Sequence, residues 1–534
     1  MERNMARWLK SYWIWLVIVG VTGVYAPLTG RTEKGEVNQK ELGTLIEVID
    51  LIQKQSLEPP NMNLVTRASI AGMLSALDPH SRYMDENEFR AMRDEQRGSF
   101  YGIGSEIKQH PDGIVVVSTI QGGPSEKAGI RKRDVIREIN GKPIENWTVN
   151  DAAQKLKGEN GTVVEVTIQR TGVTKPFRVS IVRSEITSNS VFHIFMINAT
   201  TGFIAIKDFS ETTAEEFRLA IRQLKSQGMK YLILDLRDNG GGLLNAALGI
   251  CQQILGPNEL IVTQKGRNSK DVIENRTSAN SIMDPFPMVV LINRNSASAS
   301  EIVAGSIQDH DRGLVVGQTS WGKGLVQVVM AIGRTHGLVL TTTRYYTPSG
   351  RCIQRDYSRC IDDYLLPEDE NEESTQHSGP KFKTDLNRIV YGNGGVTPDY
   401  VVSRNKPNSF VFNLSSKYDA FSKFAMQEKE KHTIKPQQVV NNAIMKRFKI
   451  WLNEQEIEYR EIDWSDPKNQ ADIRNCITIE MQRLVYNADA AFRLQSKCDP
   501  QIRKALEVMP KAEALLKQKI AVNNRNPISD ATGN

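Results

Sequence analysis

The sequence predicts a multidomain α/β protein, with an α/β core, an inserted small β-rich domain and helical regions before and after them. Residues 185–408 alternate strands with helices. Strands such as Lys230–Leu236 and Pro287–Ile292 are continuous apolar runs, typical of a parallel sheet buried on both faces. Residues 98–184 instead carry short strands with period two, which predicts a small barrel with one or two helices. A length of 534 residues fits about three domains.

The composition fits a globular protein and gives no case for a nucleic-acid partner. Hydrophobic residues make up 40% of the chain, and 68 basic against 62 acidic residues leave a net charge of only +6. The five cysteines form no zinc-like cluster, so we expect neither a metal nor another cofactor. Cys352 with Cys360 and Cys476 with Cys498 could form disulfides, or all five could be free thiols.

The N-terminus has the pattern of an export signal. Arg3, Arg7 and Lys10 precede the apolar run Trp13–Ala26. This run is shorter than the ~20 residues that span a bilayer. A cleaved signal peptide and an uncleaved membrane anchor both fit residues 1–29. Either one places the remaining chain outside the cytoplasm, in the periplasm or on the extracytoplasmic face of the membrane.

Helices are predicted on both sides of the β-rich and α/β parts. Apolar residues recur at helical spacing over 40–57, and a second helix is expected over 64–77. Further helices are expected over 439–454 and 473–494. The polar tail 521–534 is expected to be disordered. The oligomeric state, including a homo-oligomer, stays open.

A glycine run marks the first of three segments that carry chemistry. Asp235–Leu243 ends one buried strand and starts a helix, and it contains three consecutive glycines. Free amides at such a helix start can bind phosphate or a developing oxyanion. A tight strand-to-helix turn without a ligand is the alternative.

The other two segments carry a serine cluster and an isolated lysine. Asn295–Glu301 joins a buried strand to a helix, where a serine hydroxyl can point outward or merely cap the helix. In Gly317–Gln327, Lys323 stands between two glycines after a buried strand. Burial lowers the pKa of a lysine and lets it act as a base. The spacing of a nucleotide-binding P-loop is absent.

A histidine base is less consistent with the sequence than Lys323. His310 lies a helix length beyond the serine cluster, about 15 Å away at ~1.5 Å per residue. His80 and His193 lie in other segments. The lysine is therefore the better partner for a serine.

The three segments together closely resemble the carboxyl-terminal processing peptidases, also called tail-specific proteases. The resemblance implies that Ser298 is the nucleophile and that Lys323, 25 residues later, is the general base, with Gln327 supporting it. It also implies an oxyanion hole formed by the amides of Ala299 and Gly242, with Gly241 as the alternative to Gly242.

The resemblance also covers the β-rich segment, which looks like a PDZ domain. Its predicted carboxylate-binding loop is Tyr101, Gly102, Ile103 and Gly104. Gly123–Ile130 and Asp134–Ile136 look like later parts of the same domain, and Leu77–Tyr83 looks like the segment before it. Gly394–Asp399 resembles a closing strand of the peptidase. The family's PDZ groove holds a substrate C-terminus as an added strand.

The resemblance implies a serine endopeptidase that cleaves polypeptides with accessible C-termini. The expected division is 1–29 signal peptide or anchor, 36–97 helical region, 98–184 PDZ domain, 185–408 α/β Ser/Lys peptidase core, 409–520 helical region and 521–534 disordered tail. Membrane contact through an uncleaved N-terminal segment is also expected. A non-catalytic, membrane-tethered PDZ scaffold is the main alternative, and an amidase or esterase on the same core is a second.

Overall fold

The computed structural model describes most of the chain after the predicted export segment. The described residues are 39–110, 113–170, 172–268, 270–281, 283–358, 364, 379–403, 408–435, 439–486 and 488–525. No helix among them is long and apolar enough to cross a membrane. The predicted signal or anchor and Cys360 lie outside these residues. Cys476 and Cys498 are free thiols, so the disulfide considered between them is not formed.

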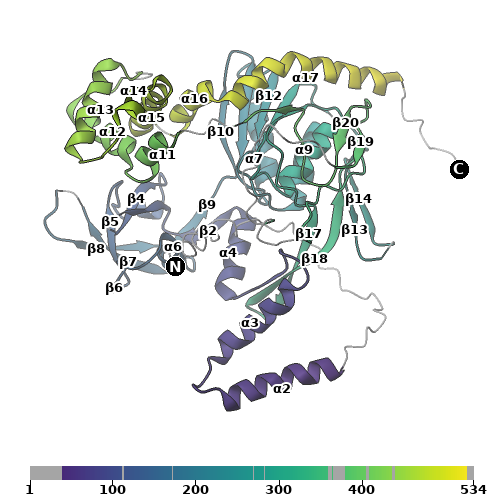
Figure 1. Ribbon diagram of the computed structural model, residues 1–534, viewed down its shortest axis with the longest axis horizontal. Helices are drawn as coiled ribbons and strands as arrows, with labels where there is room; N and C mark the ends of the chain where they lie inside the picture. Colours follow the sequence, from purple (N-terminus) through teal and green to yellow (C-terminus); the bar gives the residue numbers. More distant parts are fainter. Residues whose placement is uncertain are drawn as a thin grey trace.

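A six-stranded sheet forms the centre of the α/β core, as predicted (Figure 1). Its order is β10 (Val191–Met196), β11 (Thr201–Ile206), β12 (Tyr231–Asp235), β15 (Met288–Ile292), β16 (Leu314–Gly317) and β21 (Tyr400–Val401). All neighbours from β11 to β21 are parallel, and β10 is antiparallel at the edge. The carboxyl ends of β12, β15 and β16 therefore lie side by side at one edge.

Helices cover both faces of this sheet. Leu232 and Leu234 pack into a core with α7 (Thr213–Ser226), α8 (Leu244–Ile254) and α9 (Ala299–Asp309). Ile233, which points to the opposite face, packs with residues of the long helix α17 (Pro500–Arg525). Figure 1 shows α17 lying across that face. Helix α17 continues to Arg525, so the beginning of the predicted disordered tail is helical.

A second sheet joins the lysine segment to the residues that precede the inserted domain. Its order is β1 (Arg82–Met84), β18 (His336–Tyr346), β13 (Leu260–Lys265) and β14 (Val272–Arg276), and β17 (Leu325–Ile332) also pairs with β18. Strand β17 starts two residues after Lys323, and Arg82 pairs with Val339 of β18. This register brings β1 beside the core, which the sequence did not predict.

The inserted domain is a six-stranded antiparallel sheet with short helices. The order is β3 (Ser105–His110), β4 (Gly113–Thr119), β5 (Val135–Ile139), β7 (Val163–Gln169) and β8 (Phe177–Val182), with β6 (Lys142–Pro143) on β5. Its helices are α5 (Pro124–Lys127) and α6 (Val149–Leu156). The chain enters through β2 (Ser99–Gly102) and leaves through β9 (Ser184–Thr187), which pair with each other. Strand β3 is an edge of this sheet.

The flanking regions are helical, as predicted. Helices α2 (Gln39–Gln55), α3 (Met62–Ser75) and α4 (Glu86–Arg97) precede β2. Figure 1 shows α2 away from the body of the molecule, and its Leu42, Ile46 and Leu51 are exposed.

The C-terminal helices divide between two cores. Helices α11 (Ser409–Ser416), α12 (Ala420–Lys431), α13 (Asn442–Glu454), α14 (Glu461–Ser465) and α15 (Pro467–Val485) share a core of their own. The predicted helix over 473–494 was wrong in extent, because α15 ends at Val485 and α16 (Ala488–Cys498) begins separately.

Candidate active site

Three loops meet at the carboxyl ends of β12, β15 and β16. They carry the glycine run, the serine cluster and the lysine, in that order. Backbone hydrogen bonds connect the three loops directly. The Ala297 amide donates to the Asn239 carbonyl at 3.0 Å, and the Trp321 amide donates to the Ser296 carbonyl at 2.9 Å. The three segments singled out from the sequence therefore form one site.

Ser298 lies at the start of α9 in a strained backbone conformation. Its φ of 54° and ψ of −113° are rare for a residue with a side chain, and such strain concentrates at functional sites. The residue is buried, with 6% of its surface exposed. Gly241 faces it so closely that a Cβ there would lie 2.8 Å from Ser298 Cβ. A glycine is required at this position because a side chain would displace the serine.

Glu301 joins the predicted nucleophile to the predicted base. One carboxylate oxygen, Oε2, accepts the backbone amides of both Ser298 and Lys323, each at 2.9 Å. The other oxygen, Oε1, accepts the Gly322 amide at 2.7 Å and the Ser320 hydroxyl. Because one oxygen receives both amides, Ser298 and Lys323 are held as neighbours in space.

Lys323 is buried, and burial lowers its pKa to about 7. The positive charge of Arg82 contributes to the same lowering of the pKa, whereas the carboxylates of Glu301 and Asp78 oppose it. Burial also raises the pKa of Glu301 to about 7, against the effect of its four hydrogen bonds. A substantial fraction of Lys323 is therefore an uncharged amine at neutral pH.

The backbones of the two predicted catalytic residues are neighbours, and their side chains are not hydrogen-bonded to each other. The described residues include no hydrogen bond between Lys323 Nζ and Ser298 Oγ. Catalytic hydrogen bonds are often long without substrate and tighten in the substrate complex. The backbones of both residues are already fixed by Glu301.

Two backbone amides near the serine turn have no acceptor in the described part of the chain. They belong to Gly242 and Ala299, the residues predicted for the oxyanion hole. The Gly241 amide, the predicted alternative, is occupied, since it donates to Asn239 Oδ1 at 2.8 Å. Gly242 has a φ of 148°, and a Cβ there would lie 2.2 Å from the Phe209 carbonyl oxygen. The glycine run thus leaves one donor available beside the serine.

Gln327 lies on β17 and is buried. Its Nε2 donates to Thr341 Oγ1 at 3.1 Å, and that hydroxyl donates to Asp78 Oδ1 at 3.0 Å. Its Oε1 is buried and has no partner among the described residues. Gln327 therefore keeps an acceptor available in the neighbourhood of Asp78, whose charge also acts on Lys323.

The segment before the inserted domain contributes to the site, and no role was assigned to it from the sequence. Asp78 accepts the amide and the hydroxyl of Ser81 at 2.9 and 2.6 Å, which fixes this turn beside β18. Burial and the charge of Lys323 lower the pKa of His80 to about 2, so His80 is a neutral neighbour of the lysine. Its Nε2 lies 2.8 Å from the Tyr364 hydroxyl. The closeness of Asp78 and His80 to Lys323 follows from the pairing of β1 with β18, which the sequence alone does not show.

Glu301 was also missed, although the sequence held a signal for it. A glutamate three residues after a serine at a helix start has the spacing of a capping box. In the structure its carboxylate caps the Ser298 amide and reaches beyond it to the lysine loop.

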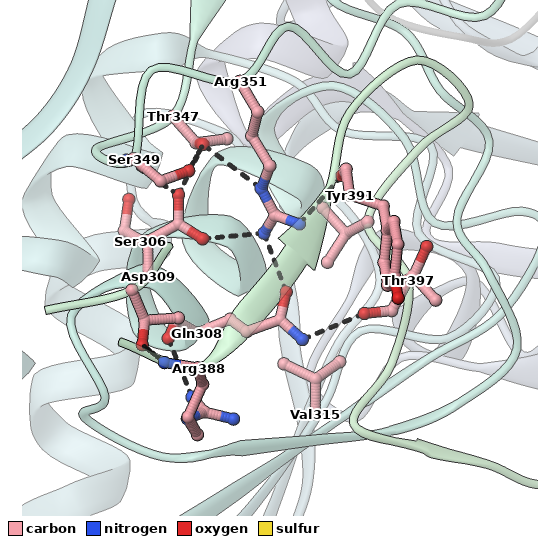
Figure 2. Close-up of polar contacts among 12 residues, drawn as sticks. Ser306, Gln308, Asp309, Val315, Thr347, Ser349, Arg351, Arg388, Tyr391 and Thr397 are labelled. Atoms are coloured by element: carbon pink, nitrogen blue, oxygen red, sulfur yellow. Dashed lines mark hydrogen bonds and ion pairs between the residues drawn. The ribbon is translucent and has the colours of Figure 1, made fainter. Parts of the chain in front are cut away.

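The far end of α9 is fixed by a second buried carboxylate, that of Asp309 (Figure 2). Arg351 Nη2 donates to Asp309 Oδ1 at 2.8 Å and to Gln308 Oε1 at 2.7 Å, and its Nη1 donates to the Tyr391 carbonyl at 3.1 Å. Gln308 Nε2 donates to the Thr397 carbonyl at 2.9 Å. These contacts hold the segment 391–397.

That segment reaches back to the lysine loop. The Val396 amide donates to Ser320 Oγ at 2.6 Å, and Ser320 in turn donates to Glu301. Both ends of α9 therefore support the same loop.

The predicted carboxylate-binding loop of the inserted domain begins within β2, which contains Tyr101 and Gly102, and continues through Ile103 and Gly104. The carbonyls of Ile103 and Gly104 accept the amides of Ser125 and Ile120, both at 2.9 Å. The amides of Ile103 and Gly104 have no acceptor in the described part of the chain. Gly104 has a φ of 69°, which turns the chain into the edge strand β3. This loop offers free amides next to an open strand edge.

A cluster with metal-ligand chemistry lies away from these loops and already contains a cation. Glu259, His310 and Asp385 lie close together. Lys519 of α17 forms ion pairs with both carboxylates, at 2.8 Å to Glu259 and 2.5 Å to Asp385. His310 Nε2 lies 2.7 Å from the Leu260 carbonyl. The cluster fixes α17 to the core.

Comparison with known proteins agrees with this geometry. Residues 200–362 match the model of peptidase family S41, and residues 115–170 match a PDZ domain. The chain is 38% identical over 327 residues to a carboxy-terminal-processing protease of Bartonella bacilliformis, covering 60% of this chain and 75% of that protein. The chain belongs to the carboxy-terminal processing proteases of peptidase family S41. It is a serine-type peptidase, so a non-catalytic scaffold is no longer supported.

Two further proteins are similar to this chain. The carboxy-terminal processing protease CtpB of Bacillus subtilis is 33% identical over 335 residues, which cover 62% of this chain and 69% of CtpB. Among solved structures, the photosystem II D1 C-terminal processing protease is 27% identical, with a TM-score of 0.37 over 68% of this chain and 88% of that one.

Proposed function

We propose that this S41 peptidase cleaves polypeptides with Ser298 as nucleophile and Lys323 as general base, after its PDZ domain has captured their C-termini. One observation carries the proposal. The buried Glu301 carboxylate holds the amides of Ser298 and Lys323 on one oxygen, and burial lowers the pKa of Lys323 to about 7. A hydroxyl and a neutral amine in one buried site are the components of a Ser/Lys pair.

In the first half-reaction, Lys323 Nζ accepts the proton of Ser298 Oγ while Oγ forms a bond to the substrate carbonyl carbon. The carbonyl oxygen becomes an oxyanion, which accepts hydrogen bonds from the amides of Gly242 and Ala299. Each such donor contributes about 3–4 kcal/mol to transition-state stabilisation in other proteases. The C–N bond then breaks, and Lys323 returns the proton to the leaving amine.

In the second half-reaction, Lys323 takes a proton from a water molecule that attacks the acyl-enzyme. The new acid is released as the bond to Ser298 Oγ breaks, and Oγ recovers the proton from Lys323. Gln327 Oε1, which is buried and has no partner within the described ranges, accepts a hydrogen bond from Lys323 Nζ and directs it toward Ser298. This contact positions the amine and transfers no proton.

Substrate capture uses the edge of the PDZ sheet. A C-terminal segment adds antiparallel to β3, and its carboxylate accepts the amides of Ile103 and Gly104, with Tyr101 and Gly102 forming the entry of the loop. The free amides and the open edge support this mode. We also propose that residues 1–29 export the chain and leave it in the periplasm or on the outer face of the cytoplasmic membrane. The mass of the mature N-terminus tests this.

The catalytic proposal is tested by the degradation of a folded reporter with an apolar C-terminal tail. The unaltered chain should degrade it, and the Ser298→Ala variant should not. Lys323→Met should also be inactive while keeping its circular dichroism spectrum and its affinity for the tail. Proteolysis that persists in the Ser298→Ala variant would contradict the nucleophile assignment.

A further inference from the structure

A cationic cleft lies next to the predicted carboxylate-binding loop, between α4 and the end of α6. It holds about 760 Å³ of space, part of it open to solvent. Its walls include four cationic side chains: Arg90, Arg93, Arg97 and Lys157. We name it the arginine cleft after these four residues and Tyr101, which also lines it.

The local sequence explains why these charges gather. Arg90, Arg93 and Arg97 are three and four residues apart on α4, so they lie on one face of the helix. Lys157 joins them from the end of α6, where a cation complements the helix dipole. The two helices together present four positive charges to one hollow.

These charges are not neutralised by ion pairs. Asp94 and Glu159 line the cleft as well, so four cations face two carboxylates. Within the described part of the chain, none of the four lies within ion-pair distance of a carboxylate. Arg93 lies over the Phe89 ring at 4.8 Å, and Lys157 lies over the Phe100 ring at 4.4 Å. These two charged groups are thereby held against aromatic rings rather than against carboxylates.

The cleft adjoins the loop that is proposed to hold the substrate carboxylate. The Gly158 amide donates to the Tyr101 carbonyl at 3.2 Å, which ties the end of α6 to the start of the loop. The free amides of Ile103 and Gly104 follow two and three residues later. A peptide that ends on these amides therefore has its C-terminus within a few residues of Tyr101 and Gly158, which line the arginine cleft.

We propose that the arginine cleft binds acidic side chains near the substrate C-terminus, so that the enzyme favours polypeptide tails carrying aspartate or glutamate among their last few residues. This inference rests on the proposed capture of C-termini by the PDZ domain. Guanidinium groups bind carboxylates well because their donors match both oxygens. The ligand class is thus an anionic peptide tail with a free α-carboxylate.

The test uses the full chain carrying Ser298→Ala and fluorescent ten-residue peptides. One peptide has glutamates among its last four residues, a second has glutamines there, and a third has the glutamates but an amidated C-terminus. Fluorescence polarisation should show the glutamate peptide binding about fivefold more tightly than the glutamine peptide. This preference should shrink as ionic strength rises.

Variants assign the preference to the cleft. The double change Arg93→Ala and Arg97→Ala should abolish the preference for glutamate while leaving the glutamine peptide bound as before. Arg178→Ala, an exposed arginine on β8 at the opposite edge of the PDZ sheet, is the matched control and should keep the preference. Circular dichroism checks that each variant is folded.

The outcomes separate this inference from the capture proposal. If the glutamate and glutamine peptides bind equally, and both need a free carboxylate, the arginine cleft does not select acidic tails although capture stands. A preference that survives in the double variant also overturns the inference. If the amidated peptide binds as tightly as the free one, capture of the C-terminus fails, and the inference fails with it.

Discussion

The two ends of α9 carry two buried carboxylates that are satisfied in different ways. Glu301, at the start, receives three backbone amides and a hydroxyl, and no cationic side chain in the described part of the chain forms an ion pair with it. Asp309, at the end, is paired with the fully buried Arg351. The two carboxylates are satisfied differently because Glu301 lies beside Lys323 and Asp309 does not. A bound cation at Glu301 would add to the charge of Arg82 near Lys323, whereas Asp309 lies a helix length away and can be neutralised by a guanidinium.

This comparison indicates that the first carboxylate serves chemistry and the second serves stability. Neutral donors hold Glu301 in place without another positive charge beside the amine. Ion pairing at Asp309 fixes the fold of the segment 391–397, which supports the same loop from outside. The predictions below separate these two roles.

The largest effect should come from the serine at the start of α9. Ser298→Ala should lower kcat by about 10⁴-fold or more, because the nucleophile is lost. Ser300→Ala is the matched control, since its hydroxyl donates to the Asn239 carbonyl at 3.0 Å and is given no part in the chemistry. Peptide-cleavage assays check both variants. An equal loss of kcat in the two variants would show that activity depends on the structure of the turn and not on the Ser298 hydroxyl.

The next effect should come from Glu301→Gln. A glutamine offers one acceptor oxygen and turns an NH₂ group toward backbone amides, so at least one buried donor loses its partner at about 1–3 kcal/mol. We expect kcat to fall about 100-fold with a smaller change in KM. The pH profile should also move to lower pH, because the Glu301 charge favours the ammonium form of Lys323. A purely structural role would lower the melting temperature without moving the profile.

At the other end of α9, Asp309→Asn should act mainly on stability. It leaves the buried Arg351 without its counter-charge, which costs about 3–5 kcal/mol of unfolding free energy. The double change Asp309→Leu and Arg351→Met should cost less, since no unpaired charge remains. Urea unfolding compares the two. Should Asp309→Asn cut kcat as Glu301→Gln does, at unchanged stability, the contrast between the two ends would be lost.

The smallest effect concerns pH. Lys323 must be uncharged to accept a proton, so kcat/KM should rise with pH through about 7. Glu301 titrates in the same range, so the measured value belongs to the pair. Arg82→Gln removes a charge that lowers the pKa of Lys323, so the profile should move to higher pH and activity at pH 7 should fall about two- to fivefold. Arg178→Gln is the control and should leave the profile unchanged.

The sequence was sufficient for the elements that local pattern determines. The continuous apolar strands over 230–236 and 287–292 predicted the parallel sheet, and α6 and β8 begin and end where the pattern placed them. The glycine run, the serine cluster and Lys323 lie at the ends of neighbouring strands because parallel strands align their carboxyl ends.

Long-range pairing explains what was missed. The pairing of β1 with β18, some 250 residues later, brings Asp78, His80 and Arg82 close to Lys323. No local sequence pattern predicts that pairing. The separate core of α11–α15 and the packing of α17 on the sheet likewise depend on tertiary contacts. Glu301 is different. The sequence showed its capping-box spacing from Ser298, but it did not show that the same carboxylate also binds the lysine loop.

The central claim is that Ser298 is acylated with the help of Lys323. The most direct test is the intact mass of the protein, quenched with acid during turnover of a tailed peptide, followed by mapping of the adduct. We expect an acyl group on Ser298 in the unaltered chain and none in the Lys323→Met variant under the same conditions. An adduct on another residue, or acylation of Ser298 at an unchanged rate without Lys323, would contradict it.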